Sequence, residues 1–346
     1  TDPDPTDGVS LDPLTGIVTV DAMTAPGVYT IDYTIASIED PSITDDATVT
    51  VTVPAEVVAN PDMATVDGTL GDTIPNVVDG NDTVNGNPAE LGVSVTIDPA
   101  SITNPVVATG GITLDPLTGI VTIDPMTPPG VYTIPYEICA VAPNETICNA
   151  TTVEVTVESD IEATPDMVVV DGTVGGMSPN IVDANDLLNG NPAVLGTTVT
   201  IDPTSVVDPV VATGGISLDP STGIVTVDPM TPPGDYDIAY TICSIVDPTV
   251  CDTTTVTVTV PAVVEAMDDP LTVTTATSGE MFPDVIGDND TLNGNPAVLT
   301  GASPTVSVTN VNDPAPTDGV SLDPLTGIVT VDAMTAPGDY VIDYTI

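Results

Sequence analysis

Apolar and polar positions alternate in short stretches along the whole chain. Between residues 57 and 157 these stretches read SVTI, ITL, IVTI, VYTIPYEIC and TTVEVTV, at residues 94–97, 112–114, 120–123, 131–139 and 151–157. Alternation with a period of two in Val, Ile, Thr and Tyr is typical of half-buried strands. Gly, Pro, Asn and Asp interrupt the pattern every ~8–12 residues, a spacing that predicts an all-β, antiparallel β-sandwich.

The pattern is itself repeated. The segment LDPLTGIVTVDAMTAPG occupies residues 11–27 and recurs unchanged at residues 322–338, and close copies begin at Leu114 and Leu218. The copies start 103 or 104 residues apart, which indicates one domain-sized unit repeated in tandem. We expect an array of Ig-like sandwiches forming an extended rod, because the junctions are short and contain Pro. The predicted boundaries are 1–55 for the C-terminal part of repeat 1, 56–160 for repeat 2, 161–263 for repeat 3, and 264–346 for repeat 4 without its last strand.

The repeated segment predicts a hairpin followed by a long strand. Asp12 and Pro13 suit the first two positions of a type I turn, and Gly16 can take the positive φ of a bulged hairpin. The next strand carries all the tyrosines, two in each repeat. We interpret them as core residues, the first lying at a corner like the tyrosine corner of Ig-like sandwiches; the alternative is a sugar-stacking platform. The pairs are Tyr29 and Tyr33, Tyr132 and Tyr136, Tyr236 and Tyr240, and Tyr340 and Tyr344.

The charge of the chain limits the partners and the kinds of catalysis that are possible. The chain has no Lys, Arg or His and 51 acidic residues, for a net charge of −51. Such a chain repels nucleic acid and anionic membrane surfaces, so we expect neither as a partner. Catalysis by a His base, a Lys Schiff base or an Arg clamp is impossible, which leaves carboxylates, hydroxyls, Tyr and Cys. Composition leaves a carboxylate pair of the glycosidase type open, but a catalytic pair in every repeat would be unusual, and we expect no enzyme and no catalytic residues. Apolar residues make up 41% of the chain, which favours a folded protein. No apolar run approaches ~18 residues, so we expect no direct membrane insertion.

Four cysteines form two local pairs. Cys139 with Cys148, and Cys243 with Cys251, bracket the loop between the last two strands of their repeats. We predict a disulfide in each, which suits an extracellular location; free thiols are the alternative, and a metal site lacks enough ligands. Repeat 1 has Ala36 at the position of the first cysteine, so the bridge is dispensable.

One motif carries candidate chemistry. The segments DGNDTVNGN, DANDLLNGN and GDNDTLNGN occupy residues 79–87, 183–191 and 287–295. Closely spaced Asp and Asn oxygens suit a hard cation, and calcium is the candidate cofactor. Asx and Gly are also the ordinary residues of turns, and that alternative stays open. The candidate ligands are Asp79, Asn81, Asp82, Asn85, Asn87, Asp183, Asn185, Asp186, Asn189, Asn191, Asp288, Asn289, Asp290, Asn293 and Asn295.

The hairpin LDPLTGIVTVD followed by PGVYTI resembles the Ig-like and cadherin-like modules of bacterial surface proteins. NDTVNG resembles a segment near the start of related cadherin-like repeats. Together the array is similar to the giant secreted adhesins of Bacteroidetes, of the gliding-motility type exported by type 9 secretion. This resemblance implies a filament at the cell surface that contacts surfaces or glycans. Thr83 and Thr291, in the sequences DTV and DTL, match the short O-glycosylation motif of that phylum.

We therefore predict the non-catalytic stalk or filament body of an extracellular, cell-surface adhesin whose repeats contact their neighbours in the same chain. The alternatives are a glycan-binding or cell-binding module acting through exposed loops, and a spacer array in a large secreted enzyme. We expect the residues that follow Ile346 to read much like residues 36–53.

Trypsin is expected to leave this segment uncut even after denaturation and reduction, because the segment offers no Lys or Arg for cleavage. Mass spectrometry of a complete tryptic digest tests this. A fragment that starts or ends inside residues 1–346 would show that the sequence assigned to the segment is wrong.

Overall fold

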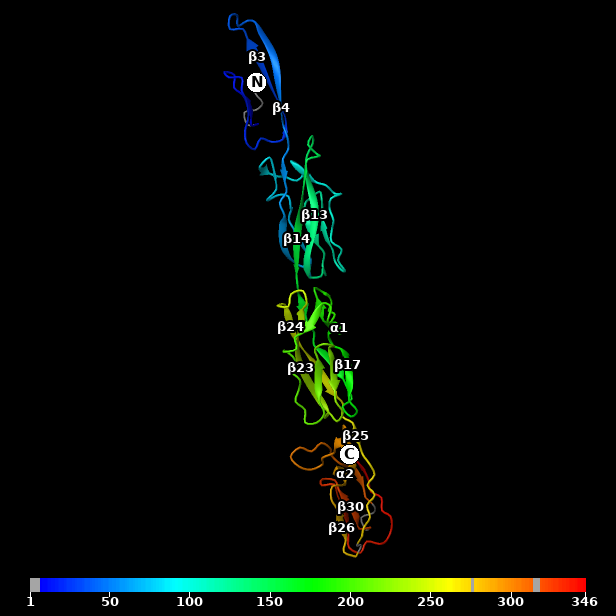
Figure 1. Ribbon diagram of the computed structural model, residues 1–346. Helices are drawn as coiled ribbons and strands as arrows, with labels where there is room; N and C mark the ends of the chain where they lie inside the picture. The colour runs from blue at the N-terminus through cyan, green and yellow to red at the C-terminus, as the bar shows by residue number, and fades with distance from the viewer. Residues whose placement is uncertain (1–6, 275–276, 314–317) are drawn as a thin grey trace. The chain divides into compact units, whose positions relative to one another are not determined.

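The computed structural model describes residues 7–274, 277–313 and 318–346. The described chain is all β apart from two short helices, α1 (Val182–Asn185) and α2 (Val285–Asn289), as Figure 1 shows. The predicted all-β class is confirmed, and the extended rod stays a prediction. The chain divides into two compact units, which are Thr1–Asp160 with Leu188–Asn191, and Ile161–Leu187 with Pro192–Ile346.

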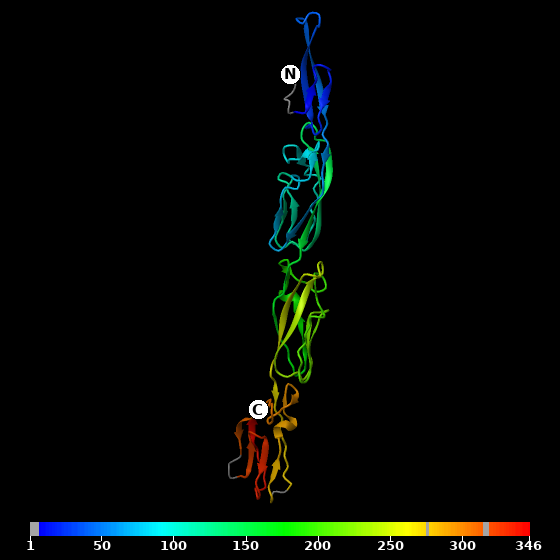
Figure 2. The same cartoon turned by 90° about the vertical axis from the view of Figure 1, so that its left-hand side faces the viewer.

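The first unit begins with two antiparallel hairpins. The short hairpin pairs Val9 with Val20, and the long one pairs residues from Gly27 with Val53 to Ala36 with Thr44 (Figure 2, blue). The predicted turn is present, since the Gly16 N–H donates to the Asp12 carbonyl over 2.8 Å and Gly16 has a φ of 67°. The four strands are β1 (Val9–Leu11), β2 (Val18–Val20), β3 (Gly27–Ala36) and β4 (Thr44–Val53).

Repeat 2 completes the first unit and contains three sheets. Their strand orders are β5-β8-β9, β10-β13-β14-β6 and β11-β12-β7. The strands are β5 (Val57–Val58), β6 (Asp62–Asp67), β7 (Asp72–Ile74), β8 (Thr83–Val84), β9 (Asn87–Pro88), β10 (Val95–Ile97), β11 (Ile112–Leu114), β12 (Val121–Ile123), β13 (Gly130–Ala140) and β14 (Cys148–Glu158).

Repeat 3 follows the same plan. Its larger sheets have the orders β16-β24-β23-β20 and β17-β22-β21, which match two of the three sheets of repeat 2. The strands are β15 (Ile161–Glu162), β16 (Asp166–Val169), β17 (Gly176–Asn180), β18 (Leu187–Leu188), β19 (Asn191–Pro192), β20 (Val199–Ile201), β21 (Ile216–Asp219), β22 (Ile224–Val227), β23 (Gly234–Ser244) and β24 (Cys251–Val260).

Repeat 4 lies in the second unit. It keeps the small sheet β25-β27-β28 and the sheet β26-β31-β30, and it pairs β29 with β32. The strands are β25 (Val264–Glu265), β26 (Glu280–Phe282), β27 (Thr291–Leu292), β28 (Asn295–Pro296), β29 (Thr309–Asn312), β30 (Val320–Asp323), β31 (Ile328–Val331) and β32 (Asp343–Thr345).

In repeats 2 and 3 the inward-facing positions of the two longest strands form much of the core. In β13 alternate residues, including Ile134 and Ile138, are fully buried, and Val153 and Val155 of β14 pack in the same core. Burying each such side chain stabilises the fold by roughly 1.5–3 kcal/mol. One pairing differs from a purely antiparallel sandwich, because β6 joins β14 in parallel, as β16 joins β24. Alternation reports which face of a strand is buried and carries no information on strand direction.

The two tyrosines of each repeat have different roles. The first closes a corner, because its hydroxyl donates to the main-chain carbonyl four residues earlier, over 2.8 Å from Tyr132 to Pro128. The second is core in repeats 2 and 3, where Tyr136 and Tyr240 are buried. Tyr33 in repeat 1 differs from this expectation and is 38% exposed, because the described residues of that repeat form only β1–β4.

Both predicted disulfides are present. Cys139 pairs with Cys148 and Cys243 with Cys251, and in each case the two residues are directly opposite one another at the end of the long hairpin. Ala36 and Thr44 occupy the equivalent pair of positions in repeat 1. The bridges therefore link two adjacent strands at the hairpin tip, and Cys139 and Cys243 are themselves buried.

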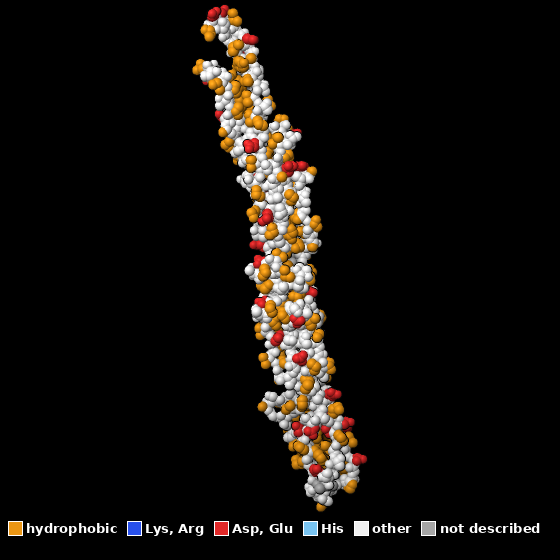
Figure 3. Space-filling view, viewed as in Figure 1, with side chains coloured by type: hydrophobic (Ala, Val, Ile, Leu, Met, Phe, Trp, Pro, Cys, Tyr) orange, Lys and Arg blue, Asp and Glu red, His pale blue; other side chains and the backbone are white. Residues whose placement is uncertain are grey.

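Acidic side chains are scattered along the surface, as Figure 3 shows, and white or orange side chains separate them. The sequence offers no cation to neutralise them, so their charge is balanced by ions from solution. No helix in the described parts of the chain has the length and apolar character needed to cross a bilayer.

Replacing Cys139 by Ala and Cys148 by Thr would reproduce the pair found in repeat 1. We expect a loss of roughly 2.5–3 kcal/mol in the free energy of unfolding of repeat 2, because a cross-link over about ten residues constrains the unfolded chain by that amount. Urea denaturation followed by circular dichroism measures it. A variant that also lacks the second bridge should no longer respond to dithiothreitol. Equal midpoints for wild type and variant would contradict the expectation.

Candidate functional site

The repeated Asn-Gly-Asn sequence forms a tight hairpin turn. Val84 pairs with Asn87 across a two-residue loop, and both loop residues have positive φ, 51° at Asn85 and 78° at Gly86. Positive φ at both central positions defines a type I′ turn, for which Asn-Gly is the preferred sequence. The later copies repeat this conformation at Asn189 and Asn293. The turn fixes the direction in which the first asparagine side chain points.

That first asparagine links one repeat to the preceding one. The Asn85 amide nitrogen donates to the carbonyls of Thr24, 2.9 Å away in repeat 1, and of Pro54, 3.1 Å away in the linker. Its amide oxygen accepts the N–H of Glu56 at 2.7 Å. One side chain therefore satisfies three main-chain groups from two repeats and the linker between them. We call this arrangement the asparagine clamp.

The clamp recurs in the second unit. The Asn293 amide donates to the carbonyls of Thr231 at 3.1 Å and Pro261 at 3.0 Å, and it accepts the N–H of Val263 at 2.7 Å. The Asn293 side chain is fully buried. Gly172 lies next to the clamp, where a side chain would not fit. A Cβ there would come within 2.5 Å of the Thr231 carbonyl oxygen and 3.0 Å of the Asn293 amide nitrogen.

The segment Leu188–Asn191 belongs to the first unit and carries a further copy of the clamp there. Asn189, also fully buried, donates to the carbonyls of Thr127 and Glu158 and accepts the Asp160 N–H. All three copies therefore bond the same kinds of atoms, at the same position of the motif.

The second asparagine of the motif extends the clamp. Asn87 donates to the carbonyl of Met23 at 2.6 Å, and Asn295 donates to the carbonyl of Met230 at 2.7 Å. These methionines have φ near 64°, in the left-handed region that side chains other than Gly and Asn rarely adopt. The adjacent Thr231 holds the loop by donating its hydroxyl to the Asp228 carbonyl at 2.7 Å. The conformation presents two successive carbonyls to the following repeat.

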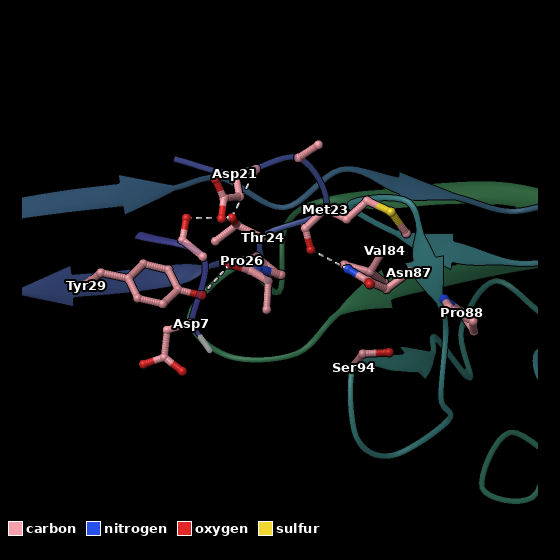
Figure 4. A pocket seen from close by; sticks show the side chains of 13 residues that line it. Asp7, Asp21, Met23, Thr24, Pro26, Tyr29, Val84, Asn87, Pro88 and Ser94 are labelled. Carbon is pink, nitrogen blue, oxygen red and sulfur yellow. Dashed lines mark hydrogen bonds between the residues drawn. The ribbon is translucent and has the colours of Figure 1, made fainter. Parts of the chain in front are cut away.

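An open cleft of about 470 Å³ lies beside the clamp between repeats 1 and 2, within the first unit. Figure 4 shows the Asn87 amide directed at the Met23 carbonyl, with Asp7 and Asp21 on the repeat 1 side. No cationic side chain exists to bind an anion there. The cleft borders the joint, and the titratable side chains that line it are Asp7, Asp21 and Tyr29.

The aspartate in the middle of the motif is buried and takes no part in the asparagine clamp. Asp82 is 2% exposed, and its Oδ1 accepts the N–H of Asn60 at 2.7 Å. Asp186 and Asp290 are 1% exposed and accept the N–H groups of Thr164 and Met267 in the same way. In all three residues Oδ2 is buried without a hydrogen-bond partner.

A second aspartate lies next to each of these. Asp62 accepts the hydroxyl of Tyr136 on Oδ2 at 3.0 Å and the amide of Asn81 on Oδ1 at 3.1 Å. Burial raises the pKa of Asp82 to about 6, and the charge of Asp62 adds to the rise. Burial also raises the pKa of the Tyr136 hydroxyl well above its usual range, so the hydroxyl stays protonated and donates. The two carboxylates therefore repel each other inside the repeat, and this repulsion contributes to the raised pKa of Asp82.

We call this arrangement the aspartate pair. The pairs are Asp62 with Asp82, Asp166 with Asp186, and Asp269 with Asp290, and their tyrosines are Tyr136, Tyr240 and Tyr344.

The candidate calcium ligands thus separate into three groups. The six asparagines of the Asn-Gly-Asn turns contact main-chain groups at the joints, and the middle aspartates enter the aspartate pairs. Asp79 and Asp183 are exposed and accept the N–H groups of Leu91 and Leu195, and Asp288 is also exposed. Asn81, Asn185 and Asn289 donate to the carbonyls of Pro61, Pro165 and Asp268.

Calcium at the loop stays a prediction. In the described chain, the only three Cys, Asp or Glu side chains close enough to share a metal ion are Glu137, Cys139 and Cys148, and those cysteines are disulfide-bonded. Thr83 and Thr291 are half-buried in β8 and β27, and their glycosylation likewise stays a prediction.

Sequence reasoning missed Asp62, Asp166 and Asp269. Each lies 74 or 75 residues before the tyrosine that donates to it. The only signal is an aspartate after the linker in every complete repeat, in NPD, TPD and MDD.

Comparison with known proteins identifies no family. No protein-family model matches the chain, and no curated protein does. The chain is similar to solved ectodomains: the human desmocollin-1 ectodomain, at 12% identity and a TM-score of 0.28, covers 96% of this chain and 66% of that one. Protocadherin γB7 EC3-6, in a cis-dimer structure, is 12% identical with a TM-score of 0.29, and the alignment covers 97% of this chain and 84% of that one. The protocadherin γB4 extracellular domain is 13% identical with a TM-score of 0.27, and the alignment covers 98% of this chain and 57% of that one. Likeness at this level carries no information on ligand or partner.

Replacing Asn293 by Asp should break the clamp in the second unit. The substitution sets a carboxylate oxygen against two carbonyl oxygens in a buried place, so we expect a loss of roughly 2–3 kcal/mol in the free energy of unfolding. The Val263 amide should also exchange faster with deuterium, because the two carbonyl oxygens repel the new carboxylate and so displace the Oδ1 that accepts the Val263 N–H.

Asn310 provides the matched control, since it is exposed and has a similar φ of 53°. Asn310→Asp adds the same charge and should change neither urea stability nor exchange at Val263. Equal effects of the two substitutions would mean that the clamp contributes nothing.

Proposed function

We propose that this chain is a non-catalytic stalk segment of an extracellular adhesion protein, in which the asparagine clamp joins successive repeats and keeps the joints from bending. The observation that supports this most directly is the burial of Asn293, whose amide makes three hydrogen bonds to main-chain atoms of repeat 3 and the linker. A joint that bends must expose or break these bonds.

The energetics favour a stiff joint. A net hydrogen bond contributes about 0.5–1.5 kcal/mol, and leaving a buried partner unsatisfied costs ~1–3 kcal/mol. Bending away from Asn293 would affect three bonds together, and Asn295 adds a fourth to Met230. Thermal energy at ~0.6 kcal/mol is small against that sum. The joint is therefore expected to hold one preferred angle.

The absence of catalysis is supported by chemistry. With no Lys, Arg or His in the sequence, the available acids and bases are carboxyl and phenol groups. The carboxyls with the highest pKa, Asp82 and Asp186, lie inside their repeats with at most 2% exposure. A substrate would have to enter the core of the repeat to reach them.

The location is supported by the disulfides, which persist in oxidising compartments. The resemblance of the hairpin and motif sequences extends the proposal to the surface filaments of gliding bacteria and to export by type 9 secretion. In that setting this segment would carry a distant adhesive domain away from the cell, and the repeats would contact one another and the surfaces or glycans nearby.

Single-particle electron microscopy of the chain tests the proposal. The wild type should show a narrow distribution of angles at each joint, and the variant Asn85→Gly with Asn293→Gly should show a broad one. Glycine keeps the left-handed turn and removes only the amide, so the repeats themselves should keep their circular dichroism. Asn310→Gly is the control and should match the wild type. Equally broad angles in all three proteins would contradict a stiff stalk.

A further inference from the structure

The same atom lacks a partner in three repeats. Six buried side-chain oxygens in the described chain have no hydrogen-bond partner, and three of them are Oδ2 of Asp82, Asp186 and Asp290. A fourth, Asn185 Oδ1, belongs to the residue beside Asp186. Buried carboxylate oxygens are nearly always hydrogen-bonded, because leaving them bare costs their full desolvation. A defect repeated at one position of every complete motif indicates a missing ligand.

The surroundings make that ligand a cation. Both oxygens of Asp62 accept hydrogen bonds, from Asn81 and Tyr136. Burial raises the pKa of Asp62, and these two donors oppose that rise by favouring the ionised carboxylate. Asp82 then lies next to a negative charge with one oxygen bare. In most proteins Lys, Arg or His would fill such a place, and this chain has none. The counter-charge must come from solution.

We propose that each aspartate pair binds one hard divalent cation of the calcium class inside its own repeat. The bare Oδ2 of Asp82 and the carboxylate of Asp62 form the anionic half of the site in repeat 2. Asp186 with Asp166, and Asp290 with Asp269, form the same half in repeats 3 and 4. The site does not depend on the stalk function, because both carboxylates of a pair belong to one repeat and the clamp asparagines are not among its ligands.

The ligand chemistry selects the class of ion. The side-chain atoms at the pairs that could ligate a cation are oxygens, from the carboxylates, the tyrosine hydroxyl and, in repeat 3, the bare amide oxygen of Asn185. Hard cations such as Ca²⁺ take six to eight oxygen ligands and accept irregular geometry, with water completing the shell. Soft metals need thiolates or imidazoles, and neither is present, since all four cysteines are disulfide-bonded.

This site differs from the loop predicted from sequence. It keeps Asp82, Asp186 and Asp290 and adds the partners Asp62, Asp166 and Asp269. It leaves out the asparagines of the clamp, whose amides are committed to main-chain groups. It also leaves out Asp79, Asp183 and Asp288, which are exposed.

Terbium luminescence is the most direct probe. Tb³⁺ replaces Ca²⁺ at oxygen sites and emits when a nearby tyrosine is excited, and the sequence has no Trp to interfere. Tyr136, Tyr240 and Tyr344 donate directly to one aspartate of each pair, so bound Tb³⁺ should be sensitised strongly. Added Ca²⁺ should abolish the signal competitively. In parallel, Ca²⁺ should raise the melting temperature beyond the effect of NaCl at matched ionic strength.

Two triple variants of the full chain separate the aspartate pairs from the loops. Asp82→Asn, Asp186→Asn and Asp290→Asn together keep the side-chain oxygen that accepts a main-chain N–H and remove the charge. They should abolish both the sensitised emission and the specific Ca²⁺ effect. Asp79→Asn, Asp183→Asn and Asp288→Asn make the same change in charge at exposed positions and should leave both responses at the wild-type level. Circular dichroism verifies that each variant is folded.

Several results would overturn the proposal. Wild-type protein that gives no sensitised emission and melts equally in CaCl₂ and NaCl would hold only a proton or water at the pairs. Loss of binding in the exposed triple variant alone would assign the ion to the loops. If the pair variant does not fold, the wild-type emission and its competition by Ca²⁺ still decide. If microscopy shows stiff joints and no ion binds, the stalk proposal stands and the cation-site proposal is wrong.

Discussion

The structure depends on one constraint, which is that the chain contains no cationic side chain. Every anionic or carbonyl oxygen that folding removes from water must therefore find a neutral donor, such as a main-chain N–H, a hydroxyl or a side-chain amide. The recurring contacts answer this need in three ways. Tyr132 closes its corner on a carbonyl, Tyr136 donates to Asp62, and Asn85 fills the joint with its amide. Among the described residues, Oδ2 of the middle aspartate is the buried oxygen that lacks such a donor in every complete motif.

The same constraint explains why backbone conformation carries so much of the joint. Without ion pairs, two repeats can be joined by apolar packing or by hydrogen bonds to the main chain, and the second route requires carbonyls that point outward. A left-handed methionine at Met230 exposes its carbonyl, and a left-handed asparagine at Asn293 brings the amide into position. Left-handed conformations are costly for most residues, at roughly 1–2 kcal/mol. The hydrogen bonds on both sides of the joint offset this cost.

Much of the fold could be predicted from sequence, and less of the site. Period-two alternation located the long strands, and the spacing of Cys139 and Cys148 gave the bridge, because both depend on residues close together in the chain. The parallel pairing of β6 with β14 could not be predicted, since alternation has no direction. The roles of Asn85 and Asp82 were also hidden: a turn, a clamp and a metal loop use the same short polar residues. Asp62 meets Tyr136 only in the folded repeat, 74 residues away, so local spacing gave no signal for it.

The asparagine clamp recognises carbonyl oxygens, which every amino acid carries, and makes no use of the side chains of the preceding repeat. The acceptor loop contains Ala22 in repeat 1 and Pro125 in repeat 2. In both repeats the threonine carbonyl of this loop accepts the asparagine amide, at 2.9 Å and 3.1 Å. Any copy can therefore follow any other. Unequal recombination between copies of the gene segment would lengthen or shorten such an array by whole repeats without compensating substitutions at the new joints. The length of the array can evolve independently of the sequence of its members.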